Sequence, residues 1–260
     1  MAQQLRQPRL AEMVAGSLRE RIVNGELADG ATLPTLDRLV DDFGVSPPSV
    51  REALRVLENE GLITVRRGNV GGAVVHCPKA ETAAYMLGLV LQSRELTVQD
   101  LGTAVHELLT TCAGLCARRE NRARTVVPAL RKAHDRAVAA IDDTGPVFEQ
   151  CCREFHQTVV ERCGNDSLVL VYSSLAWLWS AQEEVWTTRV VHDESPSQKL
   201  RQLGLDDHEA IVEAIADGDV ERTTAVTRQH VEHPDVLGPA GSAKRRIQAT
   251  RLIPGTARIG

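Results

Sequence analysis

Two short helix patterns joined by a glycine turn constrain the fold of this chain more than any other feature. Thr35 is placed to cap a first helix, and Ser46 is placed to cap a second one over about 47–60. Two prolines open the second helix, where the backbone N–H that they lack would have no partner. Gly44 supplies the break between the helices. This spacing predicts a helix-turn-helix whose second helix enters the major groove of DNA.

A further helix and a hairpin complete this N-terminal part. Apolar residues recur at helical spacing over 10–22, and Gly25 ends the pattern. After the second helix, two β-branched runs within 63–75 flank a glycine-bearing turn, which predicts a β-hairpin with Arg66 and Arg67 near its tip. Three helices followed by such a hairpin predict a winged helix-turn-helix.

The remainder of the chain shows helical periodicity only. Apolar stripes continue from residue 79 to about residue 235, interrupted by glycine, proline and polar breaks. We expect six or seven helices there, packed as an all-α bundle. The predicted fold class is therefore mainly α, with an N-terminal winged helix-turn-helix and a C-terminal helical bundle. The predicted domains are 1–78, 79–235 and a basic, flexible tail over 236–260.

Charge is unevenly distributed along the chain, whose net charge is −5. The first predicted domain has nine arginines against ten acidic residues, whereas the second has sixteen basic and twenty-five acidic residues. A domain of this acidity repels phosphate, so any contact with nucleic acid must come from the two ends of the chain. Because the first domain is not basic as a whole, a few well-placed arginines must supply that contact.

The sequence argues against several classes of protein. No stretch approaches 18 consecutive apolar residues, and the first residues lack the pattern of a secretory signal. We therefore expect a soluble, cytoplasmic protein with no membrane partner. Six cysteines without a C-x-x-C pair in such a chain are expected to be reduced thiols.

Polar side chains at the start of the second helix are suited to DNA. Ser46 and Ser49 place hydroxyls where backbone N–H groups and the helix dipole favour phosphate. Arg51 lies one turn further in, where its guanidinium can bind both major-groove acceptors of a guanine for about 1–3 kcal/mol of discrimination. The alternative is a solvated arginine paired with Glu52 or Glu58. For the hairpin arginines, the alternative is an edge kept soluble by charge.

Histidines and one cysteine are spaced to share a metal ion. Cys152 and His156 lie four residues apart on a predicted helix over 146–163, so both side chains share one face. His208, at the start of a helix, and His230, near the end of the next, return to one level in an antiparallel hairpin. Three imidazoles and a thiolate suit Zn²⁺ or a similar borderline metal. The alternative for each is a buried or hydrogen-bonded side chain without a metal.

Residues 10–75 resemble the DNA-binding domain of GntR-type bacterial transcription regulators. The most specific part of the resemblance is "VREALRVLENEGLITVRRG". It implies that the start of the recognition helix and the tip of the wing contact DNA, with Gly68 allowing close approach of the backbone. Asp37 and Pro47 depart from the family pattern, since arginines are common at both positions. The implied DNA-binding residues are Ser46, Pro47, Pro48, Ser49, Arg51, Arg66, Arg67 and Gly68.

The helical part resembles the FCD effector domain of the FadR-like branch of the same regulators. In that family an aspartate and three histidines bind a divalent metal beside a pocket for small carboxylates. Carried over by position, the histidines fall on His156, His208 and His230, while the aspartate falls on Cys152. A thiolate in place of a carboxylate shifts the metal preference toward Zn²⁺, whereas a neutral, buried Cys152 would leave three histidines.

The same resemblance indicates where an effector binds. His106 stands where the family often has an arginine that grips a carboxylate, and Arg189 is a second candidate for contact with the effector. A neutral imidazole holds an anion less firmly than arginine does. We therefore expect a carboxylate or acyl-type metabolite that is larger or less acidic than a simple carboxylate.

Together these expectations describe a ligand-responsive transcription regulator rather than an enzyme. We expect a homodimer that binds a pseudo-palindromic operator in double-stranded DNA and represses until a small metabolite, bound beside a divalent metal, releases it. One alternative is a metal-dependent hydrolase that uses the histidine cluster, although Glu154 and Glu209 are poorly placed as general bases. The other is a winged-helix module that binds a protein in place of DNA.

Overall fold

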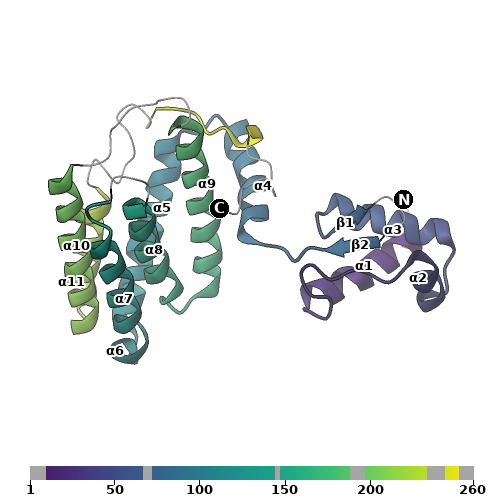
Figure 1. Cartoon of the computed structure of the whole chain (residues 1–260), viewed down its shortest axis with the longest axis horizontal. Coiled ribbons are helices and arrows are strands. Elements are labelled where there is room, and N and C mark those ends of the chain that lie inside the picture. Colours follow the sequence, from purple (N-terminus) through teal and green to yellow (C-terminus); the bar gives the residue numbers. More distant parts are fainter. Residues whose placement is uncertain (1–9, 67–71, 144–146, 188–196, 233–243, 252–260) are drawn as a thin grey trace, which may run out of the picture. The chain divides into compact units, whose positions relative to one another are not determined.

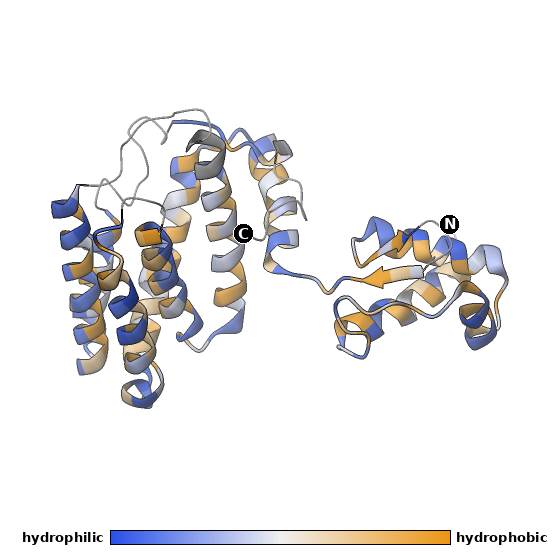
Figure 2. Ribbon diagram, in the orientation of Figure 1, coloured by the Kyte–Doolittle hydropathy of each residue, from blue (hydrophilic) through white to orange (hydrophobic). Residues whose placement is uncertain are grey.

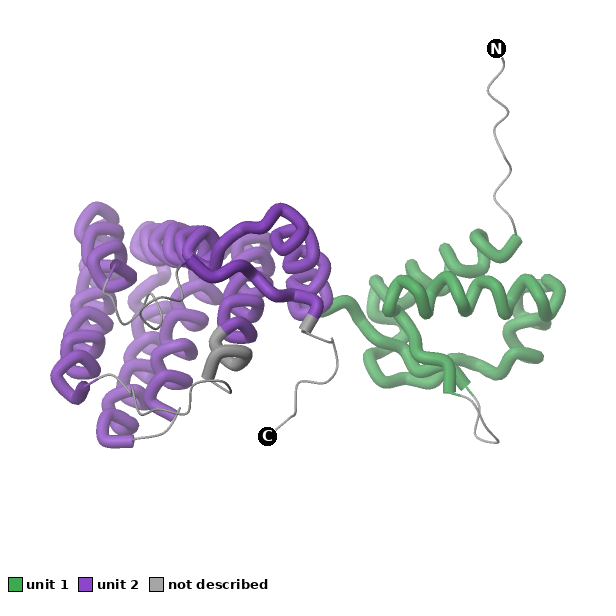
Figure 3. The backbone as a smooth tube through the Cα atoms, turned by 90° about the horizontal axis from the view of Figure 1, so that it is seen from above, with its two compact units in different colours: residues 1–79 green, residues 80–260 purple. Residues whose placement is uncertain are grey.

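The computed structural model describes residues 10–66, 72–143, 147–187, 197–232 and 244–251. The chain divides into two compact units, 1–79 and 80–260, and each is described by itself (Figure 3). No described helix is long and apolar enough to cross a lipid bilayer.

The first unit contains three helices and a two-stranded hairpin (Figure 1). Its elements are α1 (Leu10–Val23), α2 (Leu36–Phe43), α3 (Pro47–Asn59), β1 (Ile63–Arg66) and β2 (Gly72–Val75). Side chains from all five elements form one apolar core, in which Leu18, Val50 and Leu57 are fully buried. The order of helices and hairpin confirms the predicted winged helix-turn-helix.

Sequence signals set the ends of the helices in this unit. The Thr35 hydroxyl accepts a hydrogen bond from the backbone N–H of Arg38, so α2 begins at its predicted cap. Gly44 follows α2 with a φ of 63°, a left-handed conformation that glycine adopts without a steric penalty. The turn to α3 therefore falls at the predicted place.

The hairpin pairs β1 and β2 in antiparallel register, with Ile63 opposite Val75 and Arg66 opposite Gly72. Residues 30–33 add an extended segment against β2, although their sequence predicts only a turn-rich link. These backbone hydrogen bonds anchor the base of the hairpin to the unit. The base of the hairpin, and hence Arg66 beyond it, is therefore held by the core.

The second unit is an all-α bundle. Its helices are α4 (Ala80–Ser93), α5 (Val98–Arg118), α6 (Arg122–Thr125), α7 (Val127–Ala139), α8 (Val147–Glu161), α9 (Asp166–Thr187), α10 (Gln198–Asp217) and α11 (Val220–Val231), followed by the 3-10 turn η1 (Ala249–Arg251). Helix α5 packs against α8, α9, α10 and α11. Polar and apolar residues alternate along the helices, as amphipathic packing requires (Figure 2). Helix α6 is a single turn, and the seven longer helices of the described residues agree with the predicted six or seven.

Two helix ends position the candidate site. The Thr97 hydroxyl accepts from the N–H of Asp100, and the Asp100 carboxylate accepts from the N–H of Thr97, a capping box that begins α5. Gly218, with a φ of 75°, ends α10, and the Asp219 carboxylate caps α11. This short turn makes α10 and α11 an antiparallel hairpin.

The start of α10 corrects one prediction. The sequence placed His208 at the beginning of a helix, but α10 begins at Gln198, well before it. Ser197 caps the helix, and the side chains of Arg201 and Leu205 are buried, which holds the additional turns against the bundle. His208 therefore lies in the rigid middle of a helix.

The prediction of a flexible tail is wrong for residues 244–251. Ile247 and Ala249 in this segment are buried in the bundle. Its backbone N–H groups donate to the side chains of Gln92 on α4 and Gln182 on α9. We call this segment the C-terminal strap, because it joins α4, α9 and the start of α5 (Figure 1).

Candidate DNA interface and metal centre

The recognition helix α3 begins with hydroxyl groups rather than with free backbone N–H groups. The Ser46 Oγ lies 3.0 Å from the Ser49 Oγ and caps no backbone group. Pro47 and Pro48 carry no N–H, and the N–H of Ser49 donates to the Ser46 carbonyl. The two hydroxyls are therefore the donors that this end of α3 offers, and contact of Ser46 and Ser49 with phosphate stays a prediction.

Arg51 is exposed and has no acidic partner among the described residues. The Glu52 carboxylate lies 3.3 Å from the guanidinium of Arg55. The Glu58 carboxylate accepts a hydrogen bond of 2.9 Å from the backbone N–H of Val65. Both acids that could neutralise Arg51 are thus engaged elsewhere, which leaves its guanidinium free toward solvent.

Ion pairing divides the arginines of the first unit into two groups. Four of the six arginines in its described part are paired with acids, and the other two, Arg51 and Arg66, are exposed without such a partner there. The pairs are Arg19–Glu60, Arg21–Glu26, Arg38–Asp42 and Arg55–Glu52. The unpaired residues lie at the two places predicted to contact DNA, α3 and the hairpin. Arg67 and Gly68 lie outside the described residues.

Three histidines converge inside the second unit, one each from α8, α10 and α11. The His156 Nε2 lies 2.9 Å from the His230 Nε2 and 3.3 Å from the His208 Nε2. All three candidate ligand atoms lie within 4.8 Å of one another. The rings of His208 and His230 are 4.7 Å apart, as the antiparallel hairpin requires.

These separations fit a single metal ion. With bonds of about 2.0–2.1 Å and bond angles of about 90–110°, two imidazole nitrogens on one zinc ion lie about 2.9–3.4 Å apart. A neutral imidazole has one donor and one acceptor nitrogen, so three nitrogens that face one another cannot all satisfy each other. A cation among them would take up their lone pairs. His208 and His230 are only 0% and 3% exposed, so water is largely excluded as the alternative partner.

The protonation state of the cluster also suits a metal. Burial lowers the pKa of His156 and that of His208 well below 6.5, and the neighbouring His230 lowers both further. The neutral imidazole is the form that ligates metals. At neutral pH, His156 and His208 are therefore already in the binding form.

Cys152 lies outside this group, which corrects its assignment as the fourth ligand. Its side chain packs near Phe148 and Leu205 in a separate apolar cluster. Burial raises the pKa of the thiol to about 12, so the thiol is neutral in the absence of a bound ion. Among the described residues, the group of side chains close enough to share an ion contains the three histidines and not Cys152.

Two contacts around the histidines were not predicted from the sequence. The Asp207 Oδ2 lies 3.3 Å from the His230 Nδ1, and the Phe155 ring stacks on His208 with 4.0 Å between centroids. The adjacency of Asp207 to His208 is visible in the sequence. Only the register of the α10–α11 hairpin shows that its carboxylate faces the next helix, whereas the neighbouring Asp206 binds within its own helix.

His106 lies on α5 beside the histidine cluster. Its ring is 6.0 Å from the ring of Trp179 on α9. Burial lowers the pKa of His106 to about 4, and the charge of His230 adds to the effect. The imidazole is therefore neutral at pH 7 and can form hydrogen bonds without balancing an anion. Arg189, the second effector candidate, lies outside the described residues.

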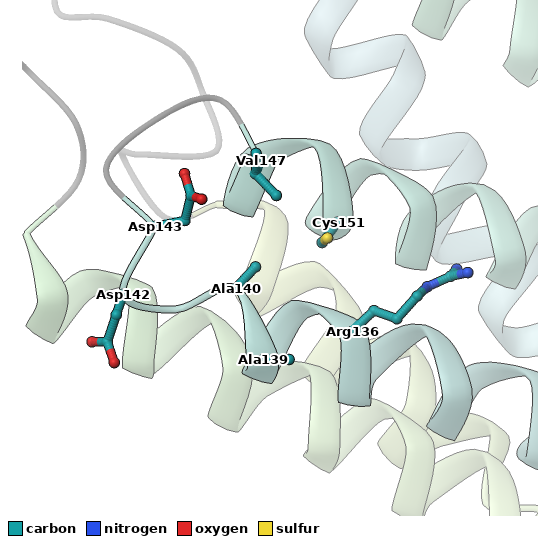
Figure 4. Close-up of a pocket in the computed structure, with 7 residues that line it drawn as sticks. All are labelled: Arg136, Ala139, Ala140, Asp142, Asp143, Val147 and Cys151. Atoms are coloured by element: carbon teal, nitrogen blue, oxygen red, sulfur yellow. The ribbon is translucent and has the colours of Figure 1, made fainter.

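A surface depression of about 590 Å³ lies between the end of α7 and the start of α8 (Figure 4). Its lining comprises Arg136, Ala139, Ala140, Asp142, Asp143, Val147 and Cys151. Neither His106 nor any of the three clustered histidines lines it. This depression is therefore separate from the candidate site.

Comparison with known families assigns both units. Residues 10–74 match the family described as "Bacterial regulatory proteins, gntR family", and residues 100–233 match the FCD domain. The chain is a GntR-family regulator with an FCD domain. The resemblance inferred from its sequence is thereby confirmed over both parts.

Relatives of this GntR-family chain are named regulators rather than enzymes. The HTH-type transcriptional repressor NanR of Klebsiella aerogenes is 28% identical over 232 residues, which cover 88% of this chain and 85% of NanR. NanR of Salmonella schwarzengrund is 28% identical over 231 residues, with 87% and 83% covered. The fold is similar to that of Streptococcus agalactiae GntR, with a TM-score of 0.64 and 21% identity over 85% of this chain and 96% of that one.

Some features of this GntR-family protein lie inside the two matched ranges and others lie outside them. The FCD match contains His156, His208 and His230, and also Asp207. Helix α4 and the C-terminal strap lie outside both matched ranges, although they pack against each other. The strap is therefore an addition to the part of the bundle that the family match covers.

Proposed function

We propose that this regulator is a repressor that binds a pseudo-palindromic operator as a homodimer and is released by a small metabolite. The observation that carries the proposal is the ion pairing of its arginines. Arg51 on the recognition helix and Arg66 on the hairpin keep free positive charges, while the other described arginines of the unit are paired. An arginine in the major groove can bind a guanine through two hydrogen bonds, and a second one can hold the phosphate backbone. The relatives named as repressors support repression.

The three clustered histidines would hold a divalent metal in the effector domain. Imidazole nitrogens favour Zn²⁺ or a neighbouring borderline ion over Mg²⁺ or Ca²⁺. When bound, the ion would supply positive charge for a carboxylate or carbonyl oxygen of the effector. His106 would contribute hydrogen bonding from the α5 side, and its neutral state favours an acyl or larger carboxylate ligand over a small, highly charged anion.

Association of two copies follows from the geometry of operator binding. Each recognition helix reads one half-site, so a pseudo-palindrome requires a two-fold pair of DNA-binding units. Large apolar side chains that are exposed on α4 and α9 support contact with a second copy. They are Met86, Val90, Leu170 and Val171. An effector that favours an arrangement unsuited to the half-site spacing would release the operator.

The DNA-binding part of the proposal is tested with the full-length protein and DNA selected from a random duplex pool. We expect the wild type to enrich an inverted repeat. Arg51→Ala should weaken binding to the enriched duplex by about 1–3 kcal/mol, or roughly 5–150-fold, because one bidentate base contact is lost. Arg21→Ala is the matched control, since Arg21 lies on α1 rather than on α3 and is paired with Glu26. Affinities are measured by fluorescence anisotropy at several salt concentrations.

Unchanged DNA binding by an Arg51→Ala, Arg66→Ala double variant would contradict the assigned interface. Failure of the wild type to retain any DNA would instead favour a winged-helix module that binds a protein.

The alternative of a metal-dependent hydrolase needs a general base at the cluster. Glu154 pairs with Arg136 and Glu209 pairs with Arg131, so neither carboxylate is free for that role.

Metal analysis of protein purified without chelators or affinity metals tests the metal centre. We expect about one equivalent of metal in the wild type and in Cys152→Ser, because the thiol lies outside the cluster. His208→Gln should lose the metal. Equal metal content in His208→Gln and wild type would contradict the proposed ligands.

A further inference from the structure

A carboxylate on α10 reaches one histidine of the cluster from behind. The Asp207 Oδ2 lies 3.3 Å from the His230 Nδ1, on the side of the ring opposite the Nε2 that faces His156. Side-chain exposure is 20% for Asp207 and 4% for His230. The contact crosses from one helix of the α10–α11 hairpin to the other.

The chemistry of this contact fixes the proton of His230. An ionised carboxylate only accepts hydrogen bonds, so the proton of a neutral His230 ring must sit on Nδ1 to satisfy Asp207. The lone pair is then on Nε2, which points to the Nε2 of His156 at 2.9 Å. Asp207 thereby holds the ring in the tautomer and the orientation that a metal ligand needs.

His208 is held differently. Its Nδ1 is buried and has no hydrogen-bond partner among the described residues. The ring is instead stacked on Phe155 with an interplanar angle of 18°. Stacking fixes the plane of a ring but does not choose which nitrogen carries the proton. The hydrogen bond between Asp207 and His230 does choose that nitrogen.

Charge gives Asp207 a second role. Three neutral imidazoles bring no negative charge to a divalent cation, and the family aspartate is replaced by Cys152, whose thiol lies in another cluster. Asp207 places one negative charge behind a ligand ring. That charge makes the imidazole of His230 a stronger donor to a cation.

We propose that Asp207 is a positioning residue for the metal ion, acting through His230. The inference rests on the proposed metal centre and adds to it a carboxylate that does not touch the ion. A purely structural role, in which the contact only joins α10 to α11, would change the stability of the metal-free protein but not the intrinsic affinity of the folded protein for metal.

The experiment measures Zn²⁺ and Co²⁺ affinities of the full-length protein by competition with a chromophoric chelator at pH 7. Asp207→Ala and Asp207→Asn should weaken both affinities by about 10–100-fold, the usual range for loss of such a partner. Asp206→Ala is the matched control and should stay within about twofold, because Asp206 binds Gln202 within α10. The visible absorption bands of bound Co²⁺ should shift in the Asp207 variants only.

The outcomes separate the two claims. If the wild type binds Co²⁺ and Zn²⁺ and the Asp207 variants bind equally tightly with unchanged Co²⁺ bands, the role of Asp207 is wrong while the metal centre stands. If the wild type binds neither ion, the metal centre is wrong and Asp207 has no ion to position. Circular dichroism and urea unfolding of the metal-free variants confirm that each is folded, and Asp207→Asn preserves the shape of the side chain.

Discussion

The charge of Arg51 is unpaired because other groups engage the acidic residues near it. Residues one apart on a helix do not face each other, whereas residues three apart do, so Glu52 meets Arg55 and not Arg51. This pairing could have been predicted from spacing alone. The engagement of Glu58 by the hairpin backbone could not, because it depends on how the strand packs against α3. The numbers of arginines and acids in the first unit are nearly equal, so composition alone does not show that Arg51 is unpaired while other arginines are paired.

The buried histidines should make the metal-free protein sensitive to acid. In the unfolded chain a histidine titrates near 6.5, whereas burial holds the pKa of His156 and His208 well below that value in the fold. The unfolded state therefore binds more protons below pH 6.5, and stability falls as the pH falls. At pH 5.5 each histidine should reduce the free energy of unfolding by about 1.4 kcal/mol relative to pH 8. Urea unfolding of chelator-treated protein at both pH values measures the loss.

A variant with His156→Gln and His208→Gln is the control for this prediction, because it lacks both groups. Its stability should decline less between pH 8 and pH 5.5 than that of the wild type. Equal declines in the two proteins would show that other groups cause the acid sensitivity.

For the candidate metal ligands, sequence spacing correctly predicted which residues of neighbouring helices come together. It did not correctly predict a shared site for two residues of the same helix. The hairpin argument brought His208 and His230 together, and the family resemblance added His156. The i, i+4 relation of Cys152 to His156 was insufficient, because a shared helical face does not decide which neighbouring side chains each residue packs against. Cys152 packs against an apolar cluster that contains Phe148, and this depends on tertiary structure.

At the scale of helices and strands, many boundaries coincide with local signals in the sequence. Capping residues and left-handed glycines marked the ends of α2, α5 and α10. The early start of α10 escaped prediction because Gly204, with its low helix propensity, interrupts the sequence before His208. Buried contacts from Arg201 and Leu205 outweigh that weak local preference.

Two glycines inside helices should respond to alanine in opposite ways. At Gly102 on α5, an added Cβ would lie 2.3 Å from the Trp179 ring, so Gly102→Ala must displace the indole. We expect overpacking to cost about 1–3 kcal/mol of stability, with a changed tryptophan fluorescence spectrum. Urea unfolding followed by circular dichroism gives the energy, and emission spectra of the folded protein report the ring.

Gly204→Ala on α10 is the matched control. An added Cβ there meets nothing within 4 Å, so the substitution should stabilise the protein by about 0.5–1 kcal/mol through helix propensity alone. Stabilisation by both substitutions would contradict the close packing of Trp179 on Gly102.

At the scale of the whole molecule, each unit has its own core, and the core of the second depends on its last described residues. A chain that lacks residues 244–260 loses the burial of Ile247 and the hydrogen bonds to Gln92 and Gln182. We expect the free energy of unfolding of the second unit to fall by about 2 kcal/mol or more, since one buried isoleucine contributes about 1.5–3 kcal/mol. Urea unfolding followed by tryptophan fluorescence reports this unit, because all three tryptophans belong to it.

A chain that ends at residue 251 keeps the strap and serves as the reference for this truncation. The two shortened chains should differ in midpoint, while the unfolding of the first unit stays the same in both. Identical fluorescence midpoints would mean that the strap adds nothing to the bundle.

The strap also sets an order of events on the ribosome. The first unit has all of its core residues within 1–79 and can fold as soon as they emerge, whereas Ile247 is synthesised after all of the helices α4 to α11. At about 5–20 residues per second, the helical bundle waits roughly 10–30 s longer for its final piece. A nascent chain is therefore expected to carry a folded first unit while its helical bundle is still incomplete, so that the two units reach their native state in the order in which they are synthesised.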